Sequence, residues 1–192
     1  LKEWEEDGVV MQVLRFRVGV FQGRKAMMAA VYGYPKGGTD LPGLVQVHGG
    51  GQQADYRACF TNGKRGYATI SLARDGRVEA PGYTVKQDNA ELFWAGKKNE
   101  PGYMITTDWG GVDGQYSDKR FKDYYGSVAP NEYTIDPVDS PRNTMWHLCT
   151  VAARRAITFL EQQPEVNRDR IGIYGHSMGG QNTGYTAGSD ER

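Results

Sequence analysis

The segment 175–179, Gly-His-Ser-Met-Gly, constrains the fold of this chain more than any other stretch. It follows the apolar run 171–174 and precedes small residues that are compatible with a helix. A Gly-x-Ser-x-Gly pattern in this setting predicts a strand that ends in a sharp turn and leaves at once as a helix, which is the layout of a nucleophile elbow. Such a turn lifts the Ser177 hydroxyl to the carboxyl-terminal edge of a sheet. Gly175 and Gly179 are needed because the two backbones approach too closely for a Cβ.

The predicted turn also offers a group that stabilises negative charge. The N–H of Met178 would lie at the helix N-terminus, where it can hold an oxyanion. The alternative interpretation is a glycine-rich turn in which Ser177 is only the cap of the helix. Because short glycine and serine patterns also arise by chance, the rest of the chain has to decide between the two interpretations.

A second glycine-rich corner, His-Gly-Gly-Gly at 48–51, follows the short apolar run 44–47. If this run and 171–174 form neighbouring parallel strands, both corners meet at one edge of the sheet, and a second oxyanion donor becomes available there. The candidate second donors are the backbone N–H groups of Gly50, Gly51 and Gln52. His48 and Gly49 are expected to support this loop, His48 through hydrogen bonds. A phosphate cradle is a weaker alternative, because the glycine motifs typical of nucleotide sites are absent.

The remaining patterns predict a mixed α/β sheet. Residues 9–18 and 25–34 read as an antiparallel hairpin, and 44–47 and 67–72 as short buried strands. A helix is expected over 54–61, ended by Asn62-Gly63. A longer helix is expected to begin at Asp139 or Ser140, with Pro141 in its first turn, and to stop at Pro164; a polar turn at 167–170 follows. Strand–helix–strand units of this kind build a sheet with a parallel centre.

Residues 74–144 form an irregular, aromatic-rich excursion with no sustained period. Long irregular segments in compact domains are usually functional loops or linkers, and the aromatic content argues against disorder. We expect this excursion to lie over the active-site edge of the sheet. Three of its aromatic residues are candidates for substrate contact: Trp94, Trp109 and Tyr116. The equally simple alternative is that they only pack the excursion.

Composition excludes several classes of partner. The chain has 192 residues, which suits one domain, and its 23 basic and 23 acidic side chains leave no net charge, so neither nucleic acid nor a membrane is an expected partner. Cys59 and Cys149 are expected to be buried free thiols, and neither a metal nor another cofactor is expected. The first residue is Leu1, so the localisation cannot be read from the start of the chain; a polysaccharide ester as substrate would favour a secreted or periplasmic protein.

The block 170–180, Arg-Ile-Gly-Ile-Tyr-Gly-His-Ser-Met-Gly-Gly, together with the upstream His-Gly-Gly-Gly and the helix ending at Pro164, resembles the α/β-hydrolase superfamily. The stretch 152–170 is similar to dienelactone-hydrolase-like and acetyl-xylan-esterase-like members. The resemblance implies a three-layer fold with N-terminal antiparallel strands and a mostly parallel centre. It also implies a triad of Ser, acid and His in that chain order.

The sequence departs from that pattern after the elbow. Residues 178–192 contain no His, and the chain's histidines are His48, His147 and His176. We expect His147 to be a partly buried structural residue on a helix, and the His176 side chain to point away from the Ser177 proton. Asp190 and Glu191 are too near the elbow helix to serve as the acid. The strands expected to flank 171–174 are also missing, which would leave an open apolar edge.

We therefore predict a single, incomplete α/β-hydrolase domain over 1–192. The predicted function is a serine hydrolase that cleaves a carboxylic ester through an acyl-enzyme on Ser177, with an acetylated carbohydrate as the candidate substrate. The acid and the His are expected outside this chain, which alone is expected to be inactive. The open edge is expected to be covered by the C-terminal remainder of the same hydrolase or by a second copy. The alternatives are a non-catalytic binding or scaffold module with a relict elbow, and a peptidase on the same fold.

Overall fold

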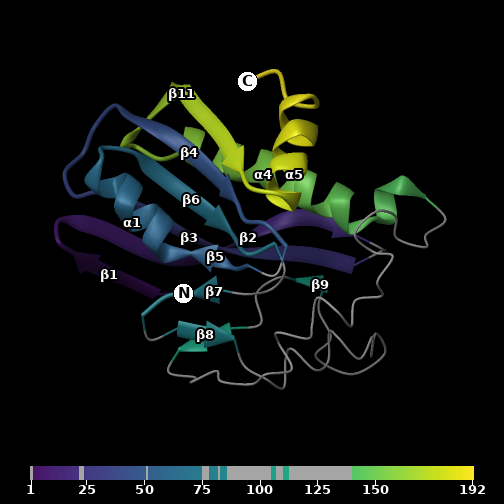
Figure 1. Ribbon diagram of the computed structural model, residues 1–192, viewed down its shortest axis with the longest axis horizontal. Coiled ribbons are helices and arrows are strands. Elements are labelled where there is room, and N and C mark those ends of the chain that lie inside the picture. The colour runs from purple at the N-terminus through teal and green to yellow at the C-terminus, as the bar shows by residue number, and fades with distance from the viewer. Residues whose placement is uncertain are drawn as a thin grey trace.

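A mixed seven-stranded sheet forms the centre of the protein (Figure 1). The computed structural model describes residues 2–21, 24–50, 52–74, 78–81, 83–85, 105–106, 110–112 and 140–192. The strands of this sheet are β1 (Lys2–Glu6), β2 (Val9–Phe21), β3 (Arg24–Pro35), β4 (Leu41–Val47), β6 (Ala68–Leu72), β9 (Ile105–Thr106) and β11 (Val166–Gly175). Their order is β1-β2-β3-β6-β4-β11, with β9 paired to β3.

The direction of the strands changes across the sheet. β1, β2, β3 and β6 pair in antiparallel fashion, so the predicted hairpin of β2 and β3 is confirmed. β6, β4 and β11 are parallel neighbours, in the register Val45 to Ile70 and Val45 to Ile173. The predicted mixed sheet with N-terminal antiparallel strands and a parallel centre is therefore what the structure shows.

Four short strands form two small sheets beside the main one. β5 (Ala54–Asp55) pairs in parallel with β7 (Val78–Glu79), and β8 (Tyr83–Val85) pairs with β10 (Gly110–Val112) in antiparallel fashion. Three of these strands, β7, β8 and β10, belong to the predicted excursion. Most of that excursion lies outside the described residues.

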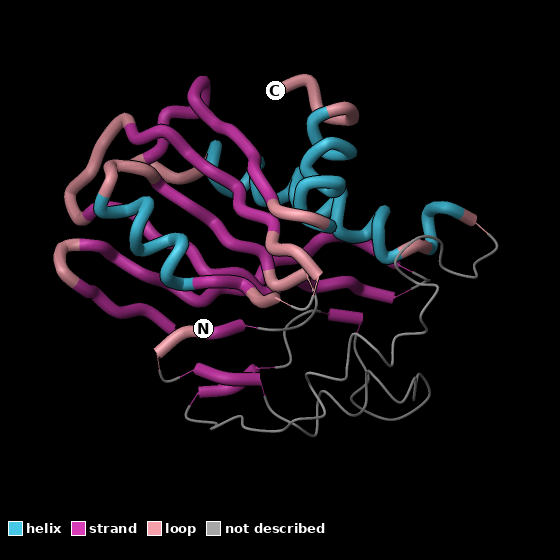
Figure 2. Tube along the Cα trace, in the orientation of Figure 1, coloured by secondary structure: helices cyan, strands magenta, loops and turns pink. Residues whose placement is uncertain are grey.

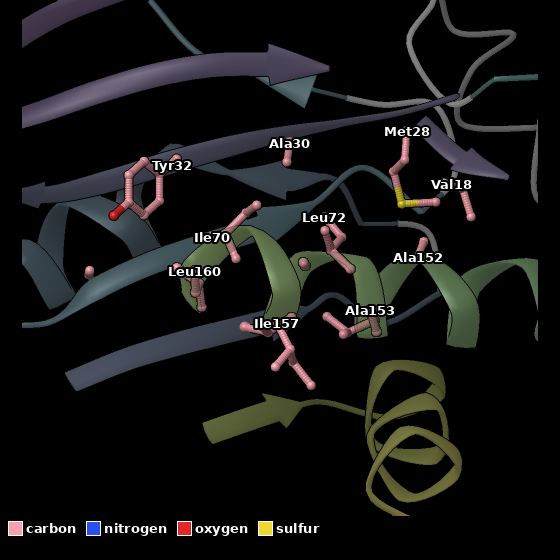
Figure 3. Close-up of a cluster of buried hydrophobic side chains, with 14 of the residues drawn as sticks. Val18, Met28, Ala30, Tyr32, Ile70, Leu72, Ala152, Ala153, Ile157 and Leu160 are labelled. Atoms are coloured by element: carbon pink, nitrogen blue, oxygen red, sulfur yellow. The ribbon is translucent and has the colours of Figure 1, made fainter. Parts of the chain in front are cut away.

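Helices cover both faces of the main sheet, which gives three layers (Figures 1 and 2). The alternation along β3 shows how. Ala30 and Tyr32 belong to a core shared with α4 (Met145–Glu161), whereas Ala29 and Val31 belong to a core shared with α1 (Tyr56–Lys64). Successive strand residues point to opposite faces, so one strand supplies both cores. Figure 3 shows the larger core, where small residues of α4 let the helix lie close to the sheet.

The first helix differs from the prediction at both ends. It begins at Tyr56, after Asp55, whose side chain accepts a hydrogen bond from the Arg57 N–H at 2.8 Å. It continues through Asn62-Gly63 because Gly63 is buried, where a Cβ would lie 2.6 Å from a methyl group of Val9. The left-handed residue that follows the helix is Gly66, with φ +88°. The predicted stop at Asn62-Gly63 was therefore wrong, because packing against β2 keeps that pair helical.

The long helix also starts later than predicted. Ser140 caps a short 3-10 helix, η1 (Pro141–Asn143), and not α4 itself. The cap of α4 is Thr144, whose hydroxyl accepts from the His147 N–H at 3.1 Å. The helix ends before Pro164 as predicted. The next strand, β11, takes in the predicted polar turn at 167–170, and its register with β4 is irregular between Val166 and Ile171.

β1 was not predicted, because residues 2–6 contain one lysine and three glutamates and so read as a charged segment. Cys59 and Cys149 are both free and buried, as expected. Among the described residues, no helix is long and apolar enough to cross a membrane.

Candidate active site

Ser177 occupies a strained backbone position between β11 and α5 (Met178–Ala187). Its dihedral angles are φ 53° and ψ −120°, and its side chain makes no capping hydrogen bond to α5. These angles are those of the first central residue of a type II′ turn, a position that normally takes glycine. The residue is exposed. The interpretation of Ser177 as merely a helix cap therefore lacks the hydrogen bond on which it depends.

The two glycines around Ser177 lie where no side chain fits. A Cβ on Gly175 would be 2.8 Å from the Val47 carbonyl oxygen and would overlap with the backbone of Gly179. A Cβ on Gly179 would be 2.7 Å from the His48 carbonyl oxygen and would overlap with the Val47 carbonyl. The first turn of α5 is thus pressed against the end of β4, which requires glycine at both positions.

The end of β4 forms the second corner, beside the first. A Cβ built on Gly49 would lie 3.0 Å from the His176 carbonyl oxygen, so the two corners touch, as the parallel pairing of β4 and β11 requires. The Gly49 N–H donates to Gln52 Oε1 at 2.7 Å, and the Gln52 N–H donates to the Gly49 carbonyl at 3.3 Å. His48 Nδ1 lies 2.8 Å from that same carbonyl. The predicted donor Gly51 lies outside the described residues.

The N-terminal turn of α5 presents backbone N–H groups beside Ser177. Gly179 N–H donates to the His176 carbonyl at 2.8 Å, and Gln181 N–H donates to the Ser177 carbonyl at 3.1 Å. Met178 N–H is the first of the helix, and such groups have no acceptor within their own helix. The geometry therefore leaves Met178 as the predicted donor at the turn.

The three histidines do not supply a base to Ser177 in this structure. His48 is buried and turned to Gly49, and His176 is exposed with its Nδ1 close to Gly49. His147 is exposed in the first turn of α4 and is not partly buried as predicted. No hydrogen bond joins the Ser177 hydroxyl to a described side chain.

Arg74 is a neighbour of this corner that the sequence analysis did not single out. It follows β6, and its guanidinium lies 3.8 Å from Met178 Sδ and 5.5 Å from the ring centroid of Trp146. The Trp146 ring in turn packs edge to face on Tyr185, with centroids 5.8 Å apart. The sequence could have indicated Arg74, because it lies at the carboxyl end of a parallel strand, where functional residues gather.

Asp190 lies at the opposite end of α5 and serves a different purpose. Arg192 donates to both of its carboxylate oxygens, at 2.7 and 2.6 Å, and Arg154 donates to one of them at 3.2 Å. These bonds, Arg192 first, hold the pKa of Asp190 well below its usual range. Arg192 also pairs with Glu161 of α4. The carboxylate is thus bound in an ion-pair network with α4, at the end of α5 that is opposite to Ser177.

A cavity of about 380 Å³ lies beside β11 at this end and is not lined by Ser177. Its apolar lining comes from Ile157, Ile171 and Ile173, and its polar lining includes Asp190 and Arg192. β11 pairs with β4 along one edge, and no described strand pairs with its other edge. The cavity therefore follows an edge of the sheet that the described residues leave open.

The described residues contain no group of three or more His, Cys, Asp or Glu side chains that could hold a metal ion. The three aromatic candidates for substrate contact, Trp94, Trp109 and Tyr116, lie outside the described residues. The site that can be described thus consists of the two backbone corners and Ser177.

Comparison with known proteins identifies this architecture. No protein-family model and no curated protein sequence matches the chain. Among solved structures, the chain is similar to an acetyl xylan esterase from Paenibacillus sp. R4, with 18% identity and a TM-score of 0.63 over 100% of this chain and 49% of that chain. It is also similar to acetyl xylan esterase 1 from Thermoanaerobacterium sp. JW/SL YS485, with 20% identity and a TM-score of 0.58 over 97% of this chain and 47% of that chain. A dienelactone hydrolase-like promiscuous phosphotriesterase from metagenomic libraries gives 13% identity and a TM-score of 0.53 over 95% of this chain and 55% of that chain.

The chain spans about half the length of these solved structures. At such low identity the likeness concerns the fold. The strand order, the parallel centre and the helices on both faces agree with it. The chain has an α/β-hydrolase-type fold, of which the described residues form a part that includes the strand–turn–helix corner at Ser177.

Proposed function

We propose that this protein is a serine hydrolase that cleaves a carboxylic ester through an acyl-enzyme on Ser177. The observation that carries the proposal is the backbone of Ser177, with φ 53° and ψ −120°, an exposed side chain and no capping bond. Holding a non-glycine residue in such a conformation costs about 1–3 kcal/mol, and such strain clusters at functional sites. A structural cap would need no such cost.

The chemistry follows from the groups around the turn. The Ser177 oxygen attacks the ester carbonyl and forms a tetrahedral intermediate, whose oxyanion is held by the Met178 N–H and by an N–H of the β4 corner. Collapse of the intermediate breaks the bond to the alkoxy group, which leaves as the alcohol after taking a proton. Water then attacks the acyl-enzyme, releases the acid and restores the hydroxyl.

The proton has to pass through a base, and no described side chain is hydrogen-bonded to the Ser177 hydroxyl. We propose that a His, oriented by an acid, comes from further polypeptide that also covers the open edge of β11: the remainder of the same hydrolase or a second copy. The Ile-lined cavity beside that edge supports this part of the proposal. Unpaired parallel edges with apolar neighbours are rarely left open in proteins.

An acetylated carbohydrate is the substrate class that we propose. Two of the similar solved structures are named acetyl xylan esterases. The candidate contacts are Trp94, Trp109 and Tyr116, because aromatic rings stack well on sugar rings. Rates on acetylated xylose and on peptide amides carrying the same acyl group distinguish this proposal from a peptidase.

Covalent labelling tests the nucleophile. We expect a fluorophosphonate to label the full-length protein that contains these 192 residues (the longest gene product). Peptide mass spectrometry should then find the adduct on Ser177. The variant S177A should not be labelled, whereas S189A, which changes another exposed serine near the end of α5, should be labelled like the parent. A folded parent protein that resists labelling would contradict the proposal and favour a binding module with a relict elbow.

The same reagent tests the source of the base. The 192-residue chain by itself should be labelled at least about a hundredfold more slowly, because general-base catalysis contributes factors of this order. Equal rates for the chain and the longer product would show that one of the chain's own histidines activates Ser177. In that case the nucleophile stands, and the proposal of an external base fails.

A further inference from the structure

We propose that Gln52 is a positioning residue, whose side chain fixes the β4 corner so that the Gly50 N–H acts as the second oxyanion donor. This inference rests on the proposed function of Ser177. It chooses Gly50 over Gln52, the two of the three candidate donors that lie among the described residues. It also gives the Gln52 side chain a structural role, in addition to its backbone N–H.

Gln52 and Gly49 form a closed pair. The Gly49 N–H donates to Gln52 Oε1 at 2.7 Å, and the Gln52 N–H returns to the Gly49 carbonyl at 3.3 Å. The N–H of Gln52 is thus directed to a carbonyl of its own loop. Of the described candidates, Gly50 remains as the donor that the β4 corner can offer to a substrate.

The direction of the Gly50 N–H follows from the Gly49 carbonyl. These two groups belong to one planar peptide unit, which is trans, so they point in opposite directions. The carbonyl accepts from the Gln52 N–H at 3.3 Å, and His48 Nδ1 lies 2.8 Å from it. The Gly50 N–H is therefore aimed out of that hydrogen-bonded ring.

The hydrogen-bonded pair of Gly49 and Gln52, which we call the brace, lies at the point where the two corners touch. Gly49 is buried, and a Cβ built on it would lie 3.0 Å from both Gln52 Oε1 and the His176 carbonyl oxygen. A shift of Gly49 would thus change its distance from the turn that carries Ser177. Small displacements of oxyanion donors have large effects on rate, since the donors must be in place before charge develops.

Amide hydrogen exchange tests the brace without reference to activity. In the ¹⁵N-labelled 192-residue chain, we expect Q52M, which keeps the length of the side chain but loses the acceptor, to raise the exchange rate of the Gly49 amide roughly fivefold or more. Q52E keeps an acceptor and should leave that rate close to the parent's. Q162M, the same chemical change at the exposed end of α4, is the matched control and should leave it unchanged.

Ester hydrolysis by the longest gene product tests the consequence. Q52M should lower kcat by roughly tenfold or more with little change in KM, because the donor matters mainly in the transition state. Q52E should also lower kcat, although Gly49 stays protected, because a carboxylate beside the oxyanion opposes the developing charge. The two variants therefore separate loss of geometry from added charge.

Two results would overturn the inference. One is a Gly49 exchange rate in Q52M equal to that of the parent, which would show that the side chain does not hold the loop. The other is faster exchange with an unchanged kcat, which would show that the brace has no catalytic role. A parent protein that is not labelled at Ser177 contradicts the proposed function instead, so the two failures can be told apart.

Discussion

Replacing Ser177 with glycine should stabilise the fold while abolishing the proposed reaction. The angles φ 53° and ψ −120° suit glycine and strain any residue with a Cβ, at a cost of about 1–3 kcal/mol. Glycine makes the unfolded chain more flexible, which removes about 0.4–1 kcal/mol of the gain. The net expectation is an increase of about 1–2 kcal/mol in the free energy of unfolding. For a chain of 192 residues this corresponds to a Tm higher by about 2–8 °C.

The variant S177A is the matched control for this prediction. It loses the hydroxyl but keeps the Cβ, and so it keeps the backbone strain. Because the Ser177 side chain makes no capping bond, S177A should unfold within about 0.5 kcal/mol of the parent. The difference between S177G and S177A then isolates the strain from the loss of the oxygen.

Urea denaturation followed by far-ultraviolet circular dichroism measures both variants, with the slope of each transition compared to confirm that the same surface unfolds. If S177G is no more stable than S177A, the turn is not strained. The main observation behind the proposed nucleophile would then lose its meaning, even if the hydroxyl proved to be exposed.

Two further changes test the packing of α5. G179A should cost more than about 3 kcal/mol, because its Cβ would overlap with the Val47 carbonyl, whereas G184A, in the same helix with nothing within 4 Å, should stabilise by about 0.5–1 kcal/mol; thermal unfolding of the two measures the contrast. D190N should destabilise the chain by about 1 kcal/mol at pH 7 through loss of the Arg192 pair. Because the folded pKa of Asp190 is lowered, its contribution is present above about pH 4 and is lost as the pH falls further, so the parent should lose stability more steeply than D190N on acidification.

Local patterns were enough to predict the elements around the site. The alternation in β2, the apolar body of β3, the apolar run of β4 and the glycines at 175 and 179 each have a direct steric or hydrophobic meaning, and each lies in the predicted element. The meeting of the two corners followed from one further assumption, that the strands before them are parallel neighbours. The parallel pairing of β4 with β11 confirms that assumption.

Positions decided by tertiary contacts could not be predicted in the same way. Asn62-Gly63 reads locally as a helix stop, but burial of Gly63 against Val9 keeps the pair in α1 and moves the left-handed residue to Gly66. The direction of the Gln52 N–H and the approach of Arg74 to Met178 likewise depend on three-dimensional folding. The spacing of residues along the sequence predicts neither of these two contacts.

The strain at Ser177 arises from contacts within the described residues, and this bears on how the proposed active site is assembled. The Gly179 N–H holds the His176 carbonyl at 2.8 Å, and Gly179 itself is pressed against the ends of Val47 and His48. These contacts fix the turn without any base beside the hydroxyl. If the proposal holds, the proposed nucleophile and its proposed oxyanion donors are organised before the proposed His docks, and the base needs only to dock beside a turn that is already formed. On this reasoning S177G should gain as much stability in the 192-residue chain as in the longer gene product. A gain confined to the longer product would show that the docking polypeptide, and not the packing of α5 on β4, imposes the strain.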